Sequence, residues 1–202
     1  EVETVAHAKA ATTLQPAIDG ILDIGGQDIK CMILKDGVID EILLNEACSS
    51  GCGSMISGLA RSMKLGVWAF SERALYAENP IYLGSRCTVF MSSRIRHAQK
   101  EGAPIDDIAA GLAYSIAKNI NNKILNTQRS LPAHATLMVQ GGAFRSDAVL
   151  RAFELVSKKT VLRPDIAELM GAYGAALPAR ERAVRARMIG TGIPSSSMLA
   201  KK

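Results

Sequence analysis

Two kinds of residue in this chain could do chemistry: glycine pairs that follow apolar runs, and thiols with small neighbours. Asp23-Ile24-Gly25-Gly26 closes the first apolar run, and Gly141-Gly142 closes a later one. A phosphate can approach a backbone that lacks side chains, and glycine amides can then point at its oxygens. An aspartate at the end of a buried strand can hold a magnesium-bound water or place a water for attack on a terminal phosphate. Taken alone, each glycine pair is explained more simply as a tight turn, because short glycine patterns are weakly specific.

The thiols offer a second kind of chemistry. Cys48 and Cys52 are spaced C-x₃-C among serine and glycine, and Cys87 lies far downstream. Small neighbours leave room for a bulky cluster and free backbone amides to donate to its sulfurs. Cys31 occupies an apolar position of an alternating segment, so we expect it in the core. Three candidate ligands remain, and a two-fold dimer could supply four thiolates to one shared cluster, two from each subunit.

The histidines carry little signal. His7, His97 and His134 have no carboxylate or serine arrangement that suggests a nucleophilic triad, and the chain has no G-x-S-x-G elbow. No second close Cys or His pair completes a zinc finger. We therefore expect surface or hydrogen-bonded histidines, and we interpret Trp68 as a packing residue.

Composition and charge exclude several classes of protein. Of the 202 residues, 48% are apolar and 4% are aromatic, which favours a packed α/β domain over an aromatic RNA-binding sheet. The whole net charge of +5 lies on residues 178–202, so we expect a solvated basic segment and no nucleic-acid partner. No apolar run approaches the roughly 20 residues of a membrane span, and no secretory signal opens the chain. We expect a cytoplasmic protein with reduced thiols and no membrane partner.

The hydrophobic pattern predicts a mixed α/β layer. We expect strands over residues 18–24, 28–34, 38–44, 136–140 and 161–164, and helices over residues 54–65, 89–100, 104–124, 145–157 and 166–177. Residues 7–11 read as a helix end or a connector, and residues 67–86 as irregular. The order is three meander strands, several helices, then β-α-β-α, with helices on the faces of the sheet.

The ordered set of motifs resembles the activator (component A) of 2-hydroxyacyl-CoA dehydratases, a family that includes ATPase subunits of benzoyl-CoA reductase. The resemblance covers about residues 5–180. The segments that carry it are Asp23–Lys30, the glycine-flanked Cys48, Cys87–Phe90, Gly141-Gly142 and Met170–Leu177. Each segment alone is weak, and their order makes the combination specific.

The resemblance implies an actin-like, sugar-kinase-like ATPase with the ribonuclease H-like fold. It implies a homodimer with one 4Fe-4S cluster between the subunits, which passes a low-potential electron to a 2-hydroxyacyl-CoA dehydratase-like partner enzyme or fused domain when ATP binds and is hydrolysed. By motif match the cluster ligands are Cys48 and Cys87, with Cys52 as a further candidate. The site for ATP and Mg²⁺ would comprise the catalytic residues Asp23 and Gln27, the phosphate-side glycines Gly25 and Gly26, and the adenosine-side glycines Gly141 and Gly142.

The sequence departs from the family pattern in two ways. Nothing before Asp23 supplies the D-x-G-[ST] glycine turn with which family members begin, and Cys52 is a thiol where small polar residues are usual. We therefore expect residues 1–178 to form the C-terminal part of the ATPase domain, one half of its two-subdomain module. Residues 179–202 would form a basic tail or terminal helix. This part alone is expected to bind nucleotide poorly and to be inactive as an ATPase.

Two other functions use the same residues. A small-molecule kinase of the actin-like fold would use the glycine turns and leave Cys48 and Cys87 inert. A non-catalytic docking domain would keep the fold and lose the response to nucleotide. Iron content and nucleotide dependence distinguish the three possibilities.

Overall fold

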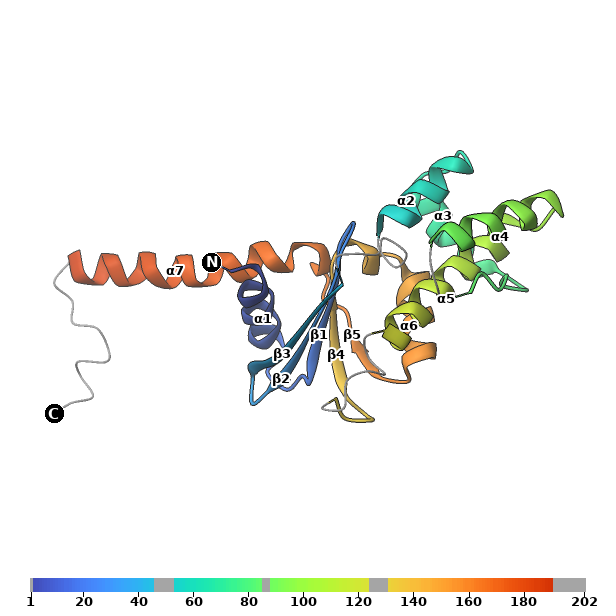
Figure 1. The fold of residues 1–202 in the computed structure, drawn as a ribbon. Helices are drawn as coiled ribbons and strands as arrows, with labels where there is room; N and C mark the ends of the chain where they lie inside the picture. Colours follow the sequence, from blue (N-terminus) through green and yellow to red (C-terminus); the bar gives the residue numbers. More distant parts are fainter. Residues whose placement is uncertain (1, 46–52, 85–87, 124–130, 191–202) are drawn as a thin grey trace.

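A five-stranded mixed sheet with helices on both faces organises the computed structural model, which describes residues 2–45, 53–84, 88–123 and 131–190 (Figure 1). The strands are β1 (Gly20–Ile24), β2 (Ile29–Lys35), β3 (Val38–Asn45), β4 (Thr136–Gln140) and β5 (Thr160–Leu162). Their order is β3-β2-β1-β4-β5. The first three strands pair antiparallel, while β4 runs parallel to β1 and β5 parallel to β4. The predicted meander followed by β-α-β-α is confirmed.

The helices agree with the sequence pattern in most places. They are α1 (Glu3–Leu14), α2 (Gly53–Ser62), α3 (Val67–Arg73), α4 (Thr88–Lys100), α5 (Ile105–Lys123), α6 (Asp147–Ser157) and α7 (Met170–Gly190), with 3₁₀ turns at Ala74–Tyr76 (η2), Gly142–Arg145 (η4) and Ala167–Leu169 (η5). The segment 67–86, expected to be irregular, contains α3 and η2. It was missed because a helix of seven residues is too short to show a clear apolar period.

Helix α1 also differs from the expectation of a helix end or connector at residues 7–11, because it forms a full helix of 12 residues. Helix α7 passes through Pro178 and continues to Gly190. The expected boundary between residues 178 and 179 therefore falls inside a helix, and the division into domain and tail stays a prediction. None of the helices in the described ranges combines the length and the apolar character that crossing a bilayer requires.

Alternation along the strands divides the core into two layers. On β1, Leu22 and Ile24 face the larger layer, which β1, β2 and β4 form with helices α2 to α6. Ile21, one residue before Leu22, joins the smaller layer under α1 and α7. Since successive side chains on a strand point to opposite faces, Asp23 lies on the α1 side. Figure 1 shows α1 and α7 on one side of the sheet and the other five α-helices on the opposite side.

The crossing of α1 and α7 depends on a glycine. A Cβ atom on Gly174 would lie 1.8 Å from the carbonyl oxygen of Ala6, and one on Gly171 would lie 2.8 Å from Nε2 of His7. These glycines let α7 approach the α1 backbone more closely than any side chain would allow. The contact fixes where α1 places its side chains relative to the sheet.

We predict that Gly174→Ala destabilises the protein by about 1–3 kcal/mol, because the added methyl group overpacks the helix crossing. The melting temperature should fall by roughly 3–10 °C in thermal unfolding followed by circular dichroism. Gly58→Ala on α2 is the control, since a Cβ there meets nothing within 4 Å. A Gly174→Ala variant with the same melting temperature as the wild-type protein would contradict the account of this crossing.

Candidate functional site

The first glycine turn is joined to α2 by backbone hydrogen bonds. The turn closes on itself where the amide of Gly25 donates to the carbonyl of Asp28, at 3.1 Å. The amide of Gly53 donates to the carbonyl of Gly25 at 3.0 Å, and that of Ser54 to the carbonyl of Gly26 at 2.9 Å. The first turn of α2 is thus anchored on the glycine turn, and a displacement of one moves the other.

The second glycine turn packs against the end of β1. Gly141 has φ +88°, and a Cβ atom there would lie 2.3 Å from the carbonyl oxygen of Ile24. Both the dihedral and the contact require glycine. The amide of Gly141 donates to the carbonyl of Ala167 at 2.8 Å, and the chain then turns through η4 into α6. The two glycine turns therefore meet at the carboxyl edge of β1 and β4, which run parallel.

A cleft of about 470 Å³ opens beside both turns, on the α2 side of the sheet. Residues that line it include Gly25, Gly26, Ser54, Trp68, Ser71, Gly142, Arg145 and Glu168. A Cβ atom on Gly26 or Gly142 would meet nothing within 4 Å, so both backbones are open. Open glycine amides at the mouth of a cleft suit the approach of a phosphate or a ribose.

The far wall of the cleft offers an aromatic face and polar groups. The guanidinium carbon of Arg145 lies 4.3 Å from the centroid of the half-exposed Trp68 ring, and its Nη1 pairs with Glu168 at 3.1 Å. The buried hydroxyl of Ser71 has no hydrogen-bond partner within the described part of the chain. A planar base with polar edges would supply stacking for Trp68 and a partner for Ser71. The residues present therefore fit a nucleotide.

The structure distributes the predicted site residues over two faces of the sheet. Gly25, Gly26 and Gly142 line the cleft, whereas Gly141 lies beneath it against β1. Gln27 is exposed in the first turn. Cys48, Cys52 and Cys87 lie outside the described residues, so their place at a cluster stays a prediction.

Asp23 is buried on the opposite face, beside α1. Burial raises the pKa of its carboxyl group above the ordinary value, while the nearby His7 and Lys30 act to lower it. Burial acts to lower the pKa of the Lys30 ammonium, but hydrogen bonds from its Nζ to Asp28 and Glu3 outweigh it and raise that pKa. Asp23 therefore belongs to a charged cluster under α1.

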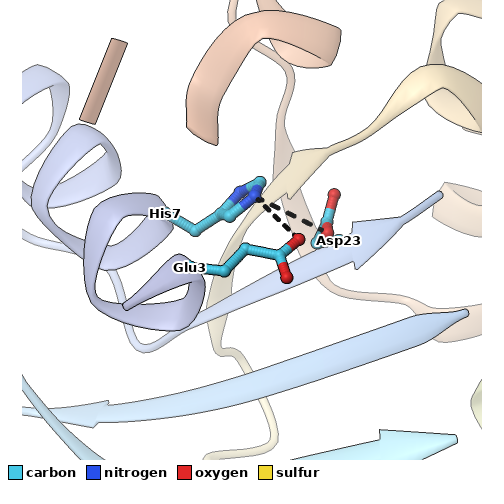
Figure 2. A group of neighbouring side chains, drawn as sticks. All are labelled: Glu3, His7 and Asp23. Atoms are coloured by element: carbon cyan, nitrogen blue, oxygen red, sulfur yellow. Dashed lines mark ion pairs between the residues drawn. The ribbon is translucent and has the colours of Figure 1, made fainter. Parts of the chain in front are cut away.

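The surroundings of His7, Trp68 and Cys31 test what the sequence predicted for each of them. His7 was expected at the surface or in an ordinary hydrogen bond. The hydrogen-bonded alternative is confirmed, because Nδ1 of His7 hydrogen-bonds Oε1 of Gln140. The residue is 8% exposed and its ring also points at Asp23, since α1 is a full helix that lies on the sheet (Figure 2). Trp68 was interpreted as packing but stands half-exposed in the cleft. Cys31 is a core residue, as predicted, and burial raises the pKa of its thiol to about 12.

Sequence reasoning missed Trp68, Arg145 and the pair Glu3 and His7 as site residues. Arg145 follows Gly142 by three residues, so the 3₁₀ turn carries it back over the cleft. Glu3 and His7 are four residues apart, a spacing that places them on one helix face. That spacing was readable once residues 3–14 were recognised as a helix.

Comparisons with known proteins agree with this geometry. The family described as BadF/BadG/BcrA/BcrD ATPase matches residues 1–179. The chain is 30% identical to the 2-hydroxyisocaproyl-CoA dehydratase activator of Clostridioides difficile over 90% of its length and 67% of that protein. It is 26% identical to the (R)-2-hydroxyglutaryl-CoA dehydratase activating ATPase of Acidaminococcus fermentans, over 91% of the chain and 69% of that protein.

Solved structures show the same fold. The 2-hydroxyisocaproyl-CoA dehydratase activator from Clostridium difficile with bound ADPNP superposes with a TM-score of 0.82 at 30% identity, over 92% of this chain and 68% of that one. The ethanolamine utilization protein EutJ from Carboxydothermus hydrogenoformans reaches a TM-score of 0.53 at 21% identity, over 87% of this chain and 53% of that one. The expected actin-like ATPase fold is confirmed.

We predict that Asp23→Asn raises the melting temperature at pH 7 by at least about 2 °C, because the variant no longer buries an ionised carboxylate. The folded state raises the pKa of Asp23, so the wild-type protein loses stability as the pH rises through that value. The advantage of the variant should therefore shrink on acidification and vanish below the unfolded-state pKa. Melting curves at several pH values test this, and a variant that is less stable at pH 7 would contradict it.

Proposed function

The chain belongs to the BadF/BadG/BcrA/BcrD ATPase family, and from this we propose that it binds ATP and acts as an activator of a 2-hydroxyacyl-CoA dehydratase-like enzyme. The cleft at the two glycine turns is the observation that carries the proposal. The functions of the relatives support the activator role. Since the chain spans 67% and 69% of two of these relatives, hydrolysis is proposed for the complete ATPase module.

The nucleotide would be held between the turns and the far wall of the cleft. The backbones of Gly26 and Gly142 would receive phosphate and ribose oxygens, since neither carries a side chain that blocks the approach. The Trp68 ring and the Arg145 guanidinium would flank the base, and the Ser71 hydroxyl would satisfy a polar edge.

The proposed catalytic residues are Asp23 and Gln27, with Mg²⁺ bound together with the nucleotide. Gln27 is exposed in the phosphate-side turn, where an amide side chain can orient a water. The Asp23 carboxylate lies behind the turns, next to Gly141, and would act through a Mg²⁺-bound water. Because Asp23 is buried on the α1 face of the sheet, it would act across the backbone of the phosphate-side turn.

The proposed redox centre is a 4Fe-4S cluster shared by two copies of the chain, with Cys48 and Cys87 from each as ligands and Cys52 as a further candidate. When bound, the cluster would supply one-electron chemistry at low potential. Cys87 directly precedes α4 and Cys52 directly precedes α2, while Cys48 lies five residues before the first residue of α2. The positive end of a helix dipole favours an anionic thiolate cluster, so two helix starts that follow thiols support this donor set.

The link between the two centres is the hydrogen-bonded contact between the glycine turn and α2. Because Gly53 and Ser54 donate to the carbonyls of the turn, a shift at the phosphates would move the start of α2. The thiols precede that start by a few residues, so the movement would reach the redox centre. This is a two-state switch biased by the terminal phosphate.

We predict that Gly26→Val folds normally and weakens ATP binding by at least about tenfold, or about 1.4 kcal/mol. Its Cβ position meets nothing within 4 Å, and its φ is not positive, so the fold tolerates a side chain that fills the phosphate approach. Isothermal titration calorimetry on the complete protein measures the effect. Gly58→Ala, outside the cleft, is the control, and equal ATP affinity in both variants would contradict the site.

We predict that anaerobically prepared dimer contains about four irons and that Cys48→Ser loses them together with the broad visible absorbance of thiolate-bound iron. Cys31→Ala, which removes a buried core thiol, should keep the iron. Iron analysis and absorption spectra make the measurement. A folded dimer that binds ATP and holds no iron would favour the kinase, and one that binds neither would favour the docking domain.

A further inference from the structure

Three side chains that could ligate a metal converge on the α1 face of the sheet. Nε2 of His7 lies 3.9 Å from Oε1 of Glu3 and 3.9 Å from Oδ2 of Asp23. Glu3 and His7 come from one face of α1, and Asp23 comes from the end of β1 (Figure 2). One ligand atom from each of the three lies within 4.8 Å of the other two. An ion bound at about 2.1 Å by all three would bring these atoms to roughly 3.0–3.4 Å from one another, so the side chains would close on it by several tenths of an ångström.

The hydrogen bonds of Gln140 fix which nitrogen of His7 faces this group. The side-chain nitrogen of Gln140 donates to the backbone carbonyl of His7 at 3.4 Å, so its oxygen is the atom that faces the ring. Nδ1 of His7 then donates to that oxygen at 2.5 Å. Nε2 is therefore the ring nitrogen that faces the two carboxylates, and in the neutral imidazole it could ligate an ion. A histidine oriented through its other ring nitrogen is the usual arrangement of a metal ligand.

Asp23 provides an independent indication. Its carboxylate is 5% exposed, and its one ion-pair partner within the described residues is His7, at a distance too long for a hydrogen bond. A buried carboxylate normally has a cation or hydrogen-bond donors in contact with it. Here the ion-pair partner lies 3.9 Å away, a separation that a cation between the two groups would bridge.

The local charge also favours a cation. Three carboxylates, from Glu3, Asp23 and Asp28, surround one ammonium group, that of Lys30. Nζ of Lys30 lies 2.7 Å from Oε1 of Glu3 and 2.7 Å from Oδ2 of Asp28. Lys30 would compete with an ion for the Glu3 oxygen and would keep Asp28 as its partner. With His7 neutral, as a metal ligand must be, two negative charges are in excess and match a divalent ion.

We propose that Glu3, His7 and Asp23 bind one divalent transition-metal ion, such as Mn²⁺ or Zn²⁺, in preference to Mg²⁺. The imidazole nitrogen is the reason for this preference, because Mg²⁺ takes oxygen ligands. The ion would tie α1 to the end of β1, directly beneath Gly141. The proposal shares Asp23 with the proposed Mg²⁺ role but requires no nucleotide and no cluster, so a test without nucleotide distinguishes its failure from that of the activator function.

The test is a titration of the complete, untagged protein with Mn²⁺ alone, after chelation and without nucleotide. Loss of the free Mn²⁺ signal in electron paramagnetic resonance counts the bound ions. Mn²⁺ is the suitable probe because thiolates select softer metals, so the cysteines contribute little. We expect one ion per chain that is retained in a hundredfold excess of Mg²⁺. Failure to bind Mn²⁺, or its displacement by equimolar Mg²⁺, would overturn the proposal.

Two substitutions test proposed ligands, a third removes the competing ammonium, and a fourth is a control. Glu3→Gln and His7→Gln should each weaken Mn²⁺ binding by at least about tenfold. Glu3 is exposed, so its substitution tests the site even if the buried His7 variant folds poorly. Lys30→Met should act in the opposite direction and tighten binding several-fold, because it removes the competing ammonium. His97→Gln removes an exposed histidine that pairs with Glu101 at 3.1 Å, and it should change nothing. Equal affinities in all four variants would assign the binding to other residues and refute the site.

Discussion

Two backbone hydrogen bonds, from the first amides of α2 to the carbonyls of the Gly25-Gly26 turn, are the constraint on which this structure depends. They join a turn whose backbone lies open in a cleft to a helix that begins one residue after Cys52 and five after Cys48. Without these hydrogen bonds, neither the turn nor the helix would link the cleft to the start of α2. In the proposed activator, these hydrogen bonds would pass a change at the cleft to the first residues of α2.

The sheet keeps two polar regions apart by strand alternation. Leu22 and Ile24 pack under the cleft side, whereas Asp23 between them faces α1. The cleft and the cluster under α1 therefore share one strand end and lie on opposite faces. Gly141 packs directly on the end of β1, so the cleft and the charged cluster both border the backbone of Asp23 and Ile24.

Much of this arrangement was predictable from the sequence, because apolar alternation and glycine pairs are local signals. These signals predicted the three-strand meander, both glycine turns and the burial of Cys31. The short α3 was missed for lack of periodicity, and the approach of His7 to Asp23 was missed because it depends on α1 lying on the sheet. Contacts such as that of Arg145 with Trp68 join residues 77 positions apart, and no local pattern reports them.

The central claim is that nucleotide at the glycine turns changes the environment of a cluster held by the thiols. The most direct measurement is the rate at which a chelator removes iron from the anaerobic homodimer with ATP or with ADP bound. The account predicts different rates for the two nucleotides. Identical rates, in protein shown to bind both nucleotides and to hold its iron, would contradict it.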